Sequence, residues 1–250
     1  MPPAKLVYCR FYAELNDFLP PDARQTDLAR PADAPGSVKD VIEGLGVPHP
    51  EVELVLVNGR PVDFGCLVGG GDRVAVYPRL RRLPMPGPPL RPAWMGEPRF
   101  LLDVHLGRLA SYLRLAGFDT AYASDATDAA LAAASRAEGR ALLTRDRGLL
   151  KRREVEHGYW VRETRPRRQL AEVLRHFDLA GRLQPLARCG RCNGRLSPVE
   201  SAAVVDELPP RTRREHHVFH RCDLCGRVYW RGSHVARIER LLARAASGAD

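Results

Sequence analysis

The chain has 250 residues, of which 44% are hydrophobic, and its 39 Lys and Arg residues outnumber 30 Asp and Glu residues. This length allows two or three domains of ordinary size. No apolar run approaches the roughly 20 residues needed to span a bilayer. The opening segment, MPPAKLVYCRFYAEL, alternates and carries an acid early, unlike a secretory signal. We therefore expect a cytoplasmic protein, and the composition excludes a membrane partner.

The charge is unevenly distributed. Residues 1–80 carry 8 basic and 11 acidic side chains, residues 81–139 carry 7 and 6, and residues 140–250 carry 24 and 13, so the net charges are −3, +1 and +11. This asymmetry favours a polyanion, most simply nucleic acid, as the partner of the second half. Of the 39 cations 36 are Arg, which a GC-rich genome also explains. Base composition does not explain the difference between the halves.

Residues 1–80 alternate strands with a helix. A capping box at residues 37–40 opens the helix, Gly46 closes it, and Asn58-Gly59 is a turn signal. The expected strands are residues 5–15, 52–57 and 73–77. This order, with the phrases VNGRPV and GDRVAVYP, resembles ubiquitin-like β-grasp (α+β) domains of the sulfur-carrier type. Such carriers need a free diglycine terminus, whereas this chain continues for 171 residues after Arg79. We therefore expect a domain that docks or spaces something, such as a protein partner.

Residues 81–98 contain six prolines together with scattered Arg residues. Proline at this density blocks both helix and sheet, so the segment predicts a semi-rigid linker or a strap lying across a neighbour.

Residues 99–182 predict an α/β domain with a parallel sheet and flanking helices, because short apolar strands alternate with helical patterns. Gly117 and Gly139 are expected to end the first two helices. The expected strands are residues 99–104, 118–122, 141–144 and 159–162, and the expected helices are 106–116, 128–138 and 167–177.

Acidic residues follow the strands of this domain. Asp103 and Asp146 lie at two strand ends, and Asp125 and Asp128 lie just beyond a third. Ligand-binding groups collect beyond the carboxyl ends of parallel strands, and carboxylates gathered there suit Mg²⁺ or Mn²⁺. Asp is also common at helix N-caps, so a cap at Thr127 or Asp128 is the alternative.

Two cysteine pairs, Cys189-x-x-Cys192 and Cys222-x-x-Cys225, predict a structural Zn²⁺ site in residues 183–250. The 29 residues between the pairs exceed the usual ribbon spacing, so a long excursion must leave and return. Disulfides are the rival interpretation. The expected reducing compartment, and the absence of a close partner for the remaining cysteines Cys9 and Cys66, argue against them.

Longer phrases carry a family resemblance. RFLLDVHLGRLASYLRLAGFDTAY, SDATDAAL and ALLTRDRGLL resemble the Mut-seven C-terminal ribonuclease domain, a branch of the PIN-like nucleases. CGRCNGRL and CDLCGRVYWRGSH resemble the zinc ribbon fused to that domain, and the β-grasp piece resembles its ubiquitin-like partner. The resemblance implies a metal-dependent ribonuclease acting on RNA phosphodiesters.

The resemblance also assigns residues. Asp103 and Asp146 correspond to the acids of the first and last motif strands, Asp128 to the acid opening the second helix, with Asp125 as the neighbouring candidate. Thr144 is implied to orient a carboxylate, and Arg145 to lie near a phosphate. Many PIN nucleases carry a fourth acid shortly after the last one, where this chain has Arg147-Gly148, a departure that leaves one firmly held metal ion. The alternatives are a non-catalytic RNA-binding or adaptor protein, and a protein-interaction module acting through the β-grasp domain.

Overall fold

A computed structural model describes residues 5–32, 34–79, 86–92, 96–232, 235 and 239–244. The chain divides into two compact units, which we describe separately. Unit 1 comprises residues 1–95, 132–139 and 146–160, and unit 2 comprises residues 96–131, 140–145 and 161–250. In the described part of the chain, no helix is both long and apolar enough to cross a membrane.

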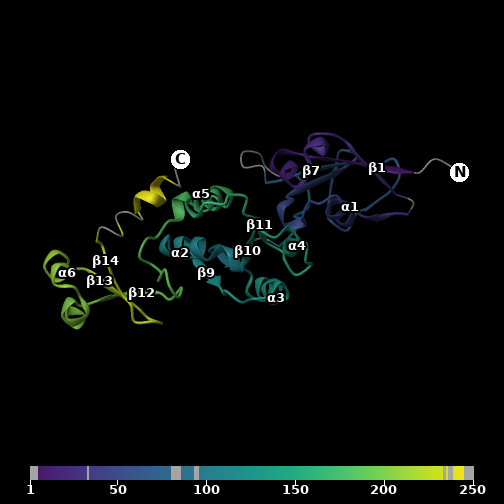
Figure 1. The fold of residues 1–250 in the computed structure, drawn as a ribbon. Helices are drawn as coiled ribbons and strands as arrows, with labels where there is room; N and C mark the ends of the chain where they lie inside the picture. The colour runs from purple at the N-terminus through teal and green to yellow at the C-terminus, as the bar shows by residue number, and fades with distance from the viewer. Residues whose placement is uncertain are drawn as a thin grey trace. The chain divides into compact units, whose positions relative to one another are not determined.

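Unit 1 contains a five-stranded sheet in the order β2-β1-β7-β4-β5, of which β1 and β7 are labelled in Figure 1. The strands β1 and β7 are parallel, and the other neighbours are antiparallel. The helix α1 (Val38–Gly44) begins after Ser37, whose side chain accepts from the Asp40 N–H at 3.1 Å. This bond is the one that the N-cap residue of a capping box makes, so the predicted helix start is confirmed. The strands are β1 (Leu6–Phe11), β2 (Leu28–Pro31), β4 (Leu54–Val57), β5 (Arg60–Val62) and β7 (Arg73–Tyr77), with a small ladder of β3 (Gly36–Ser37) and β6 (Leu67–Val68).

The first strand is shorter than predicted. Alternate residues Val7, Cys9 and Phe11 point into the core, but β1 ends at Phe11 and a 3-10 helix follows over Ala13–Phe18. The expectation of a strand over residues 5–15 is therefore wrong at its end. Ala13 has a left-handed φ of 47°, and the Asn16 side-chain amide donates to the Phe11 and Ala13 carbonyl oxygens, which closes the chain into a turn.

Part of the proline-rich segment lies across the β-grasp domain. In the described residues 86–92, Arg91 donates to the carbonyl oxygens of Pro50 and Val52 at 3.1 and 2.9 Å and pairs with the Glu53 carboxylate. Leu90 packs against the same core. Of the two interpretations of this segment, a semi-rigid linker or a strap across a neighbour, the contacts of residues 86–92 therefore support the strap. Residues 80–85 and 93–95 lie outside the described residues, and the boundaries at 80, 98 and 182 stay predictions.

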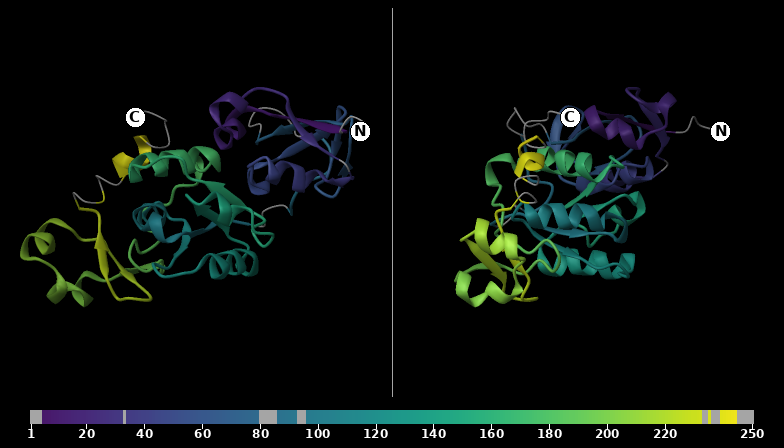
Figure 2. Two further views of the ribbon diagram at one scale, coloured as in Figure 1. Left: turned by 45° about the vertical axis from the view of Figure 1, so that its right-hand side comes forward. Right: turned by 60° about the vertical axis from the view of Figure 1, so that its left-hand side comes forward.

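The predicted α/β alternation is confirmed. A four-stranded sheet has the order β11-β10-β8-β9, with β8 parallel to both β9 and β10. The helix α2 packs on α5 (Figure 2). Gly117 ends α2 with φ of 102°. The strands are β8 (Arg99–Leu102), β9 (Asp119–Tyr122), β10 (Ala141–Thr144) and β11 (Gly158–Trp160), and the helices are α2 (Gly107–Leu115), α3 (Asp128–Glu138), α4 (Arg147–Leu150) and α5 (Pro166–His176).

The C-terminal part forms an antiparallel sheet of β12 (Leu196–Val199), β13 (Phe219–Cys222) and β14 (Val228–Trp230). The predicted long excursion joins β12 to β13 through short helical turns that include α6 (Pro210–Glu215). Its residues Val204 and Leu208 pack on Phe219, so the excursion carries a small core of its own.

Candidate active site and metal centre

The parallel register aligns the ends of three strands. Leu102 of β8 is opposite both Leu143 of β10 and Tyr122 of β9. Because the strands run in the same direction, their carboxyl ends meet at one edge of the sheet, where open α/β sheets bind ligands. Asp103 directly follows β8, and Asp146 lies two residues beyond β10.

Asp103 is the best-held acid of the set. It is only 4% exposed. Its Oδ1 accepts from the His105 N–H at 2.9 Å, and its Oδ2 accepts from the Thr144 hydroxyl and from the Arg145 N–H at 3.0 Å. Thr144, itself fully buried, therefore lies with Arg145 against one carboxylate oxygen.

This arrangement suits a cation. A carboxylate has about four lone-pair sites, and three donors contact that of Asp103, so a site on Oδ1 is left for a further partner. The three donors that contact the Asp103 carboxylate are a hydroxyl group and two backbone N–H groups, none of which carries a charge. A buried charge without a counter-charge is costly, so the donor set and the burial fit a hard divalent ion such as Mg²⁺ or Mn²⁺.

Asp128 and Asp125 are exposed at the start of the second predicted helix. Asp128 is the first residue of α3, but the N-cap is Thr127, whose hydroxyl accepts from the Ala130 N–H at 3.3 Å. The structure therefore resolves the cap alternative in favour of Thr127. The carboxylate of Asp128 is not used for capping.

The residues after β10 differ in what they contact. Asp146 is exposed and caps α4, with its Oδ1 accepting from the Gly148 and Leu149 N–H groups at 2.7 and 3.4 Å. The Arg145 guanidinium donates to the carbonyl oxygens of residues 161, 162 and 163 at 3.2, 3.1 and 2.5 Å. These bonds tie the end of β10 to the segment after β11, and the role of Arg145 near a phosphate stays a prediction.

Four cysteines form one close group. The Sγ atoms of Cys189, Cys192, Cys222 and Cys225 lie within 4.8 Å of one another. Within the described ranges this is the one group of three or more His, Cys, Asp or Glu residues whose ligand atoms approach so closely, and the set Asp103, Asp128 and Asp146 is not such a group. Four sulfur ligands suit tetrahedral Zn²⁺, whereas Mg²⁺ keeps several of its waters and needs few direct carboxylate contacts.

The surroundings of the four cysteines shift the pKa values of two of their thiols. The Tyr229 hydroxyl lies 3.0 Å from the Cys189 Sγ. Burial opposes ionisation of this thiol, but hydrogen bonds from Tyr229 and from the backbone of Cys192 and Arg191 outweigh it and lower the pKa of Cys189 to about 6. Burial raises the pKa of Cys192 to about 12, and the neighbouring sulfurs add to that effect. Within this pair Cys189 therefore ionises more readily than Cys192, and a divalent ion would provide the charge that stabilises further thiolates.

The first cysteine knuckle docks on the sheet through Asp119, a residue that the sequence analysis did not select. The Asp119 carboxylate accepts from Arg140 at 2.7 Å, from the Asn193 amide at 2.8 Å and from Arg188 at 3.3 Å. Asn193 in turn accepts from the Thr120 N–H at 2.9 Å. Burial would raise the pKa of Asp119, but its bonds to Arg140 and Asn193 outweigh this and lower it. No local pattern links residues 119 and 193.

Two family models match the chain. The model described as Mut7-C RNAse domain matches residues 98–242, and the model described as Mut7-C ubiquitin matches residues 4–84. A search of curated proteins and a search of solved structures find no match. The first model spans more than half of the chain and includes both centres described above. The chain therefore belongs to the Mut7-C RNase domain family and carries a Mut7-C ubiquitin-like domain before the RNase domain.

Proposed function

We propose that this protein is a metal-dependent ribonuclease that hydrolyses RNA phosphodiester bonds. The observation that carries the proposal is the buried Asp103 carboxylate, which is oriented by three donors and has a free lone-pair site at the carboxyl edge of the sheet. The chain's membership in the Mut7-C RNase domain family also supports the hydrolysis of RNA.

Asp103, Asp128 and Asp146 would hold the Mg²⁺ or Mn²⁺ ion, with Asp125 as the neighbouring acid. A bound divalent ion would activate a water and stabilise an in-line displacement at phosphorus. The protein's own groups do the positioning. Thr144 and the Arg145 N–H hold the Asp103 Oδ2 in one orientation, so the carboxylate needs little reorganisation when it binds the ion.

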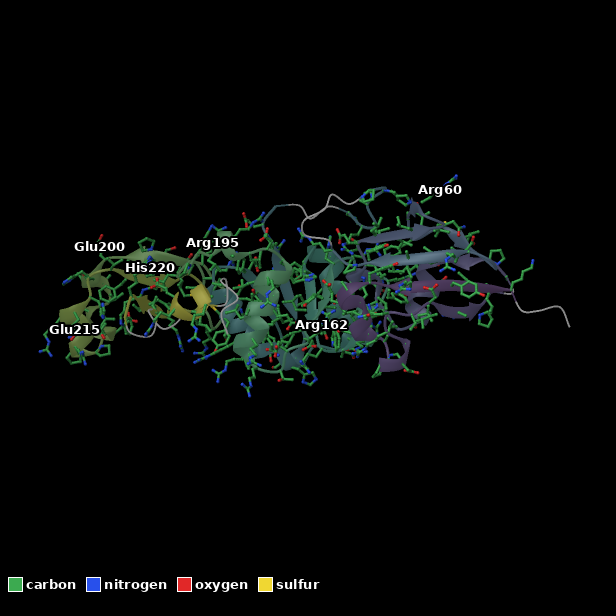
Figure 3. All side chains as sticks on the ribbon, turned by 90° about the horizontal axis from the view of Figure 1, so that it is seen from above. Arg60, Arg162, Arg195, Glu200, Glu215 and His220 are labelled. Atoms are coloured by element: carbon green, nitrogen blue, oxygen red, sulfur yellow. The ribbon has the colours of Figure 1, made fainter. Side chains whose placement is uncertain are left out.

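RNA is the proposed substrate, and the basic second half would bind its backbone. Residues 140–250 carry a net charge of +11, and Arg165 and Arg167 at the start of α5 are exposed. Arg195 on the ribbon is exposed as well (Figure 3). Neutralising phosphates with such side chains releases counterions and gives affinity without reading sequence.

The four-cysteine centre would hold a structural Zn²⁺ ion, because the four thiol groups leave no open ligand position for chemistry. Each described cysteine is free of a disulfide, which supports a cytoplasmic location, where thiols stay reduced.

Cleavage of labelled RNA and single-stranded DNA, with Mn²⁺, with Mg²⁺ and with EDTA, tests the proposal. We expect RNA cleavage that EDTA abolishes. Asp146→Asn keeps the shape but reduces the attraction for the ion, so it should abolish cleavage while RNA affinity stays equal or rises. The matched control is Asp125→Asn, which should have the smaller effect. Full cleavage by Asp146→Asn, or equal cleavage with and without EDTA, would contradict the assignment.

The second candidate is a non-catalytic RNA-binding or adaptor protein, with the ubiquitin-like domain binding a protein partner. The nucleases that this chain resembles carry a fourth acid where this chain has Arg147-Gly148. This difference favours the second candidate. Salt-dependent RNA binding without cleavage under any metal condition would select this candidate.

A further inference from the structure

The side chain of Arg147, next to the proposed catalytic Asp146, is held by the ubiquitin-like domain. Its guanidinium lies 3.9 Å from the Trp160 ring centroid and 5.3 Å from that of Phe18. Its two terminal nitrogens donate to the carbonyl oxygens of Phe18 and Asp17, each at 3.2 Å. All these residues belong to unit 1. The ubiquitin-like domain therefore contributes one ring and two carbonyl groups to the fixation of Arg147, and the second ring is Trp160 of β11.

The rest of the segment from 146 to 160 is attached to the same domain. The Lys151 ammonium donates to the Glu43 carbonyl oxygen at 2.8 Å, and the His49 Nε2 lies 2.8 Å from the Val155 carbonyl oxygen. The Trp160 N–H donates to the Glu51 carboxylate at 2.6 Å.

Two polar side chains of the ubiquitin-like domain are buried at these attachments. His49 is 7% exposed and Glu51 is 5% exposed. Buried polar groups need partners, and the segment 146–160 supplies one to each. The attachment is thus built from satisfied buried polar groups and does not rest on apolar contact alone.

The helix that begins after Asp146 cannot fix its own position. The helix α4 spans only Arg147–Leu150, and helices of this length are unstable in isolation. The Asp146 carboxylate is oriented by the N–H groups of Gly148 and Leu149, so its direction depends on where α4 lies. Arg147 is the first residue of that helix and its anchor to the domain.

We propose that the ubiquitin-like domain positions Asp146 for catalysis, and that Arg147 is the positioning residue through which it acts. Arg147 does not contact the reacting atoms in this account. It holds the first turn of α4, and that turn holds the carboxylate. The inference rests on the proposed function, since it assigns Asp146 to the metal-binding acids. A displacement of about 1 Å at such a group can cost roughly a hundredfold in rate.

The test uses full-length variants. Arg147→Met keeps an unbranched apolar stem but removes the guanidinium over the rings, its charge and both hydrogen bonds, and Arg147→Lys keeps a cation near the rings. Arg60→Met is the matched control, because Arg60 in β5 is exposed and extends away from the ribbon (Figure 3). Trp160→Phe retains an aromatic face, and Trp160→Leu removes it. Trp160 belongs to β11, and its ring lies 5.0 Å from that of Phe18. This pair therefore tests the ring contact of the guanidinium without changing Arg147, if Arg147→Met unfolds.

The first readout is amide hydrogen exchange at Gly148 and Leu149, which reports the Asp146 cap without any need for activity. We expect exchange about five- to tenfold faster in Arg147→Met and Trp160→Leu, as for loss of an N-cap. Arg147→Lys and Trp160→Phe should lie between these variants and the wild type, and Arg60→Met should match the wild type. Unchanged exchange in Arg147→Met would overturn the proposal.

The second readout is cleavage kinetics. We expect kcat to fall between about tenfold and a hundredfold in Arg147→Met, while KM for RNA stays within about twofold. An equal kcat, or a loss confined to KM, would overturn the positioning role. If the wild type cleaves no RNA, the proposed function fails, whereas the exchange measurement still decides whether Arg147 fixes Asp146.

Discussion

The side-chain amide of Asn193 donates to the Asp119 carboxylate at 2.8 Å, which joins the first cysteine knuckle to the beginning of β9. Asn193 follows Cys192 directly and adopts a left-handed φ of 69°, a conformation that Asn tolerates better than most residues. Arg114 of α2 adds a second link, since it donates to the Arg191 carbonyl oxygen at 2.8 Å and to the Thr120 carbonyl oxygen at 2.9 Å. The conformation of the knuckle thus determines contacts of the RNase domain.

Loss of zinc should therefore also weaken contacts outside the ribbon, at the beginning of β9. We expect about one Zn²⁺ per chain by elemental analysis, as four thiolates suit a closed structural site. Cys222→Ser should lose the ion, unfold the ribbon and speed amide exchange at Thr120, whose N–H donates to Asn193. Cys66→Ser, at a half-buried cysteine of the ubiquitin-like domain, is the control and should keep both zinc and protection. Protein purified without chelator and lacking zinc would contradict this prediction.

Thr144 should matter through its hydroxyl group. Thr144→Val keeps a similar shape but removes the donor to the Asp103 Oδ2, so we expect a loss of about 1–3 kcal/mol in the free energy of unfolding. If the site is catalytic, kcat should fall by about tenfold as the carboxylate loses its orientation. Thr144→Ser retains the hydroxyl and should stay near the wild type. The prediction is wrong if Thr144→Val and Thr144→Ser behave alike in denaturation and cleavage.

Acid should destabilise unit 1 through His157. Burial and the charge of Arg91 lower the pKa of His157 from its usual 6.5. Below pH 6.5 the unfolded chain binds the proton more readily than the folded chain, so the free energy of unfolding falls until the lowered pKa is reached. His157→Gln does not titrate. Its stability should therefore change less than that of the wild type between pH ~7.5 and ~5.5 in denaturant titrations, and equal changes would refute the prediction.

RNA affinity should fall steeply as salt rises. We expect log K to decrease linearly with log salt, and Arg165→Gln or Arg167→Gln to reduce that slope by about 1 each. Arg60→Gln, in the domain whose sequence carries a net charge of −3, should leave the slope unchanged. Binding measured by fluorescence anisotropy at several salt concentrations checks this, and an equal loss of slope in all three variants would show that the basic second half has no special role.

Local patterns allowed much of the architecture to be predicted. The two cysteine pairs, the capping signal at Thr127 and the glycine that ends α2 act within a few residues, so the sequence displays them directly. The edge strand β2 (Leu28–Pro31) was missed, because four residues ending in proline give a weak strand signal.

The contacts that define the candidate site are mostly long-range. Asp103 and Thr144 are 41 residues apart, and Asp119 lies 69 and 74 residues from Arg188 and Asn193. Nothing in a local pattern encodes such a pair. A polar residue at a strand start, like Asp119, has the same appearance in a sequence whether it is solvated or bound by several donors.

The hydrogen bonds of Arg147 to Phe18 and Asp17 join positions 129 and 130 residues apart. During synthesis the N-terminal domain leaves the ribosome first and generally folds as a unit. Contacts of such large sequence separation form slowly, since a long loop must close. We expect the ubiquitin-like domain to be complete before residues 146–160 emerge, so that it serves as a template on which the last strand and the short helix of the nuclease module are assembled.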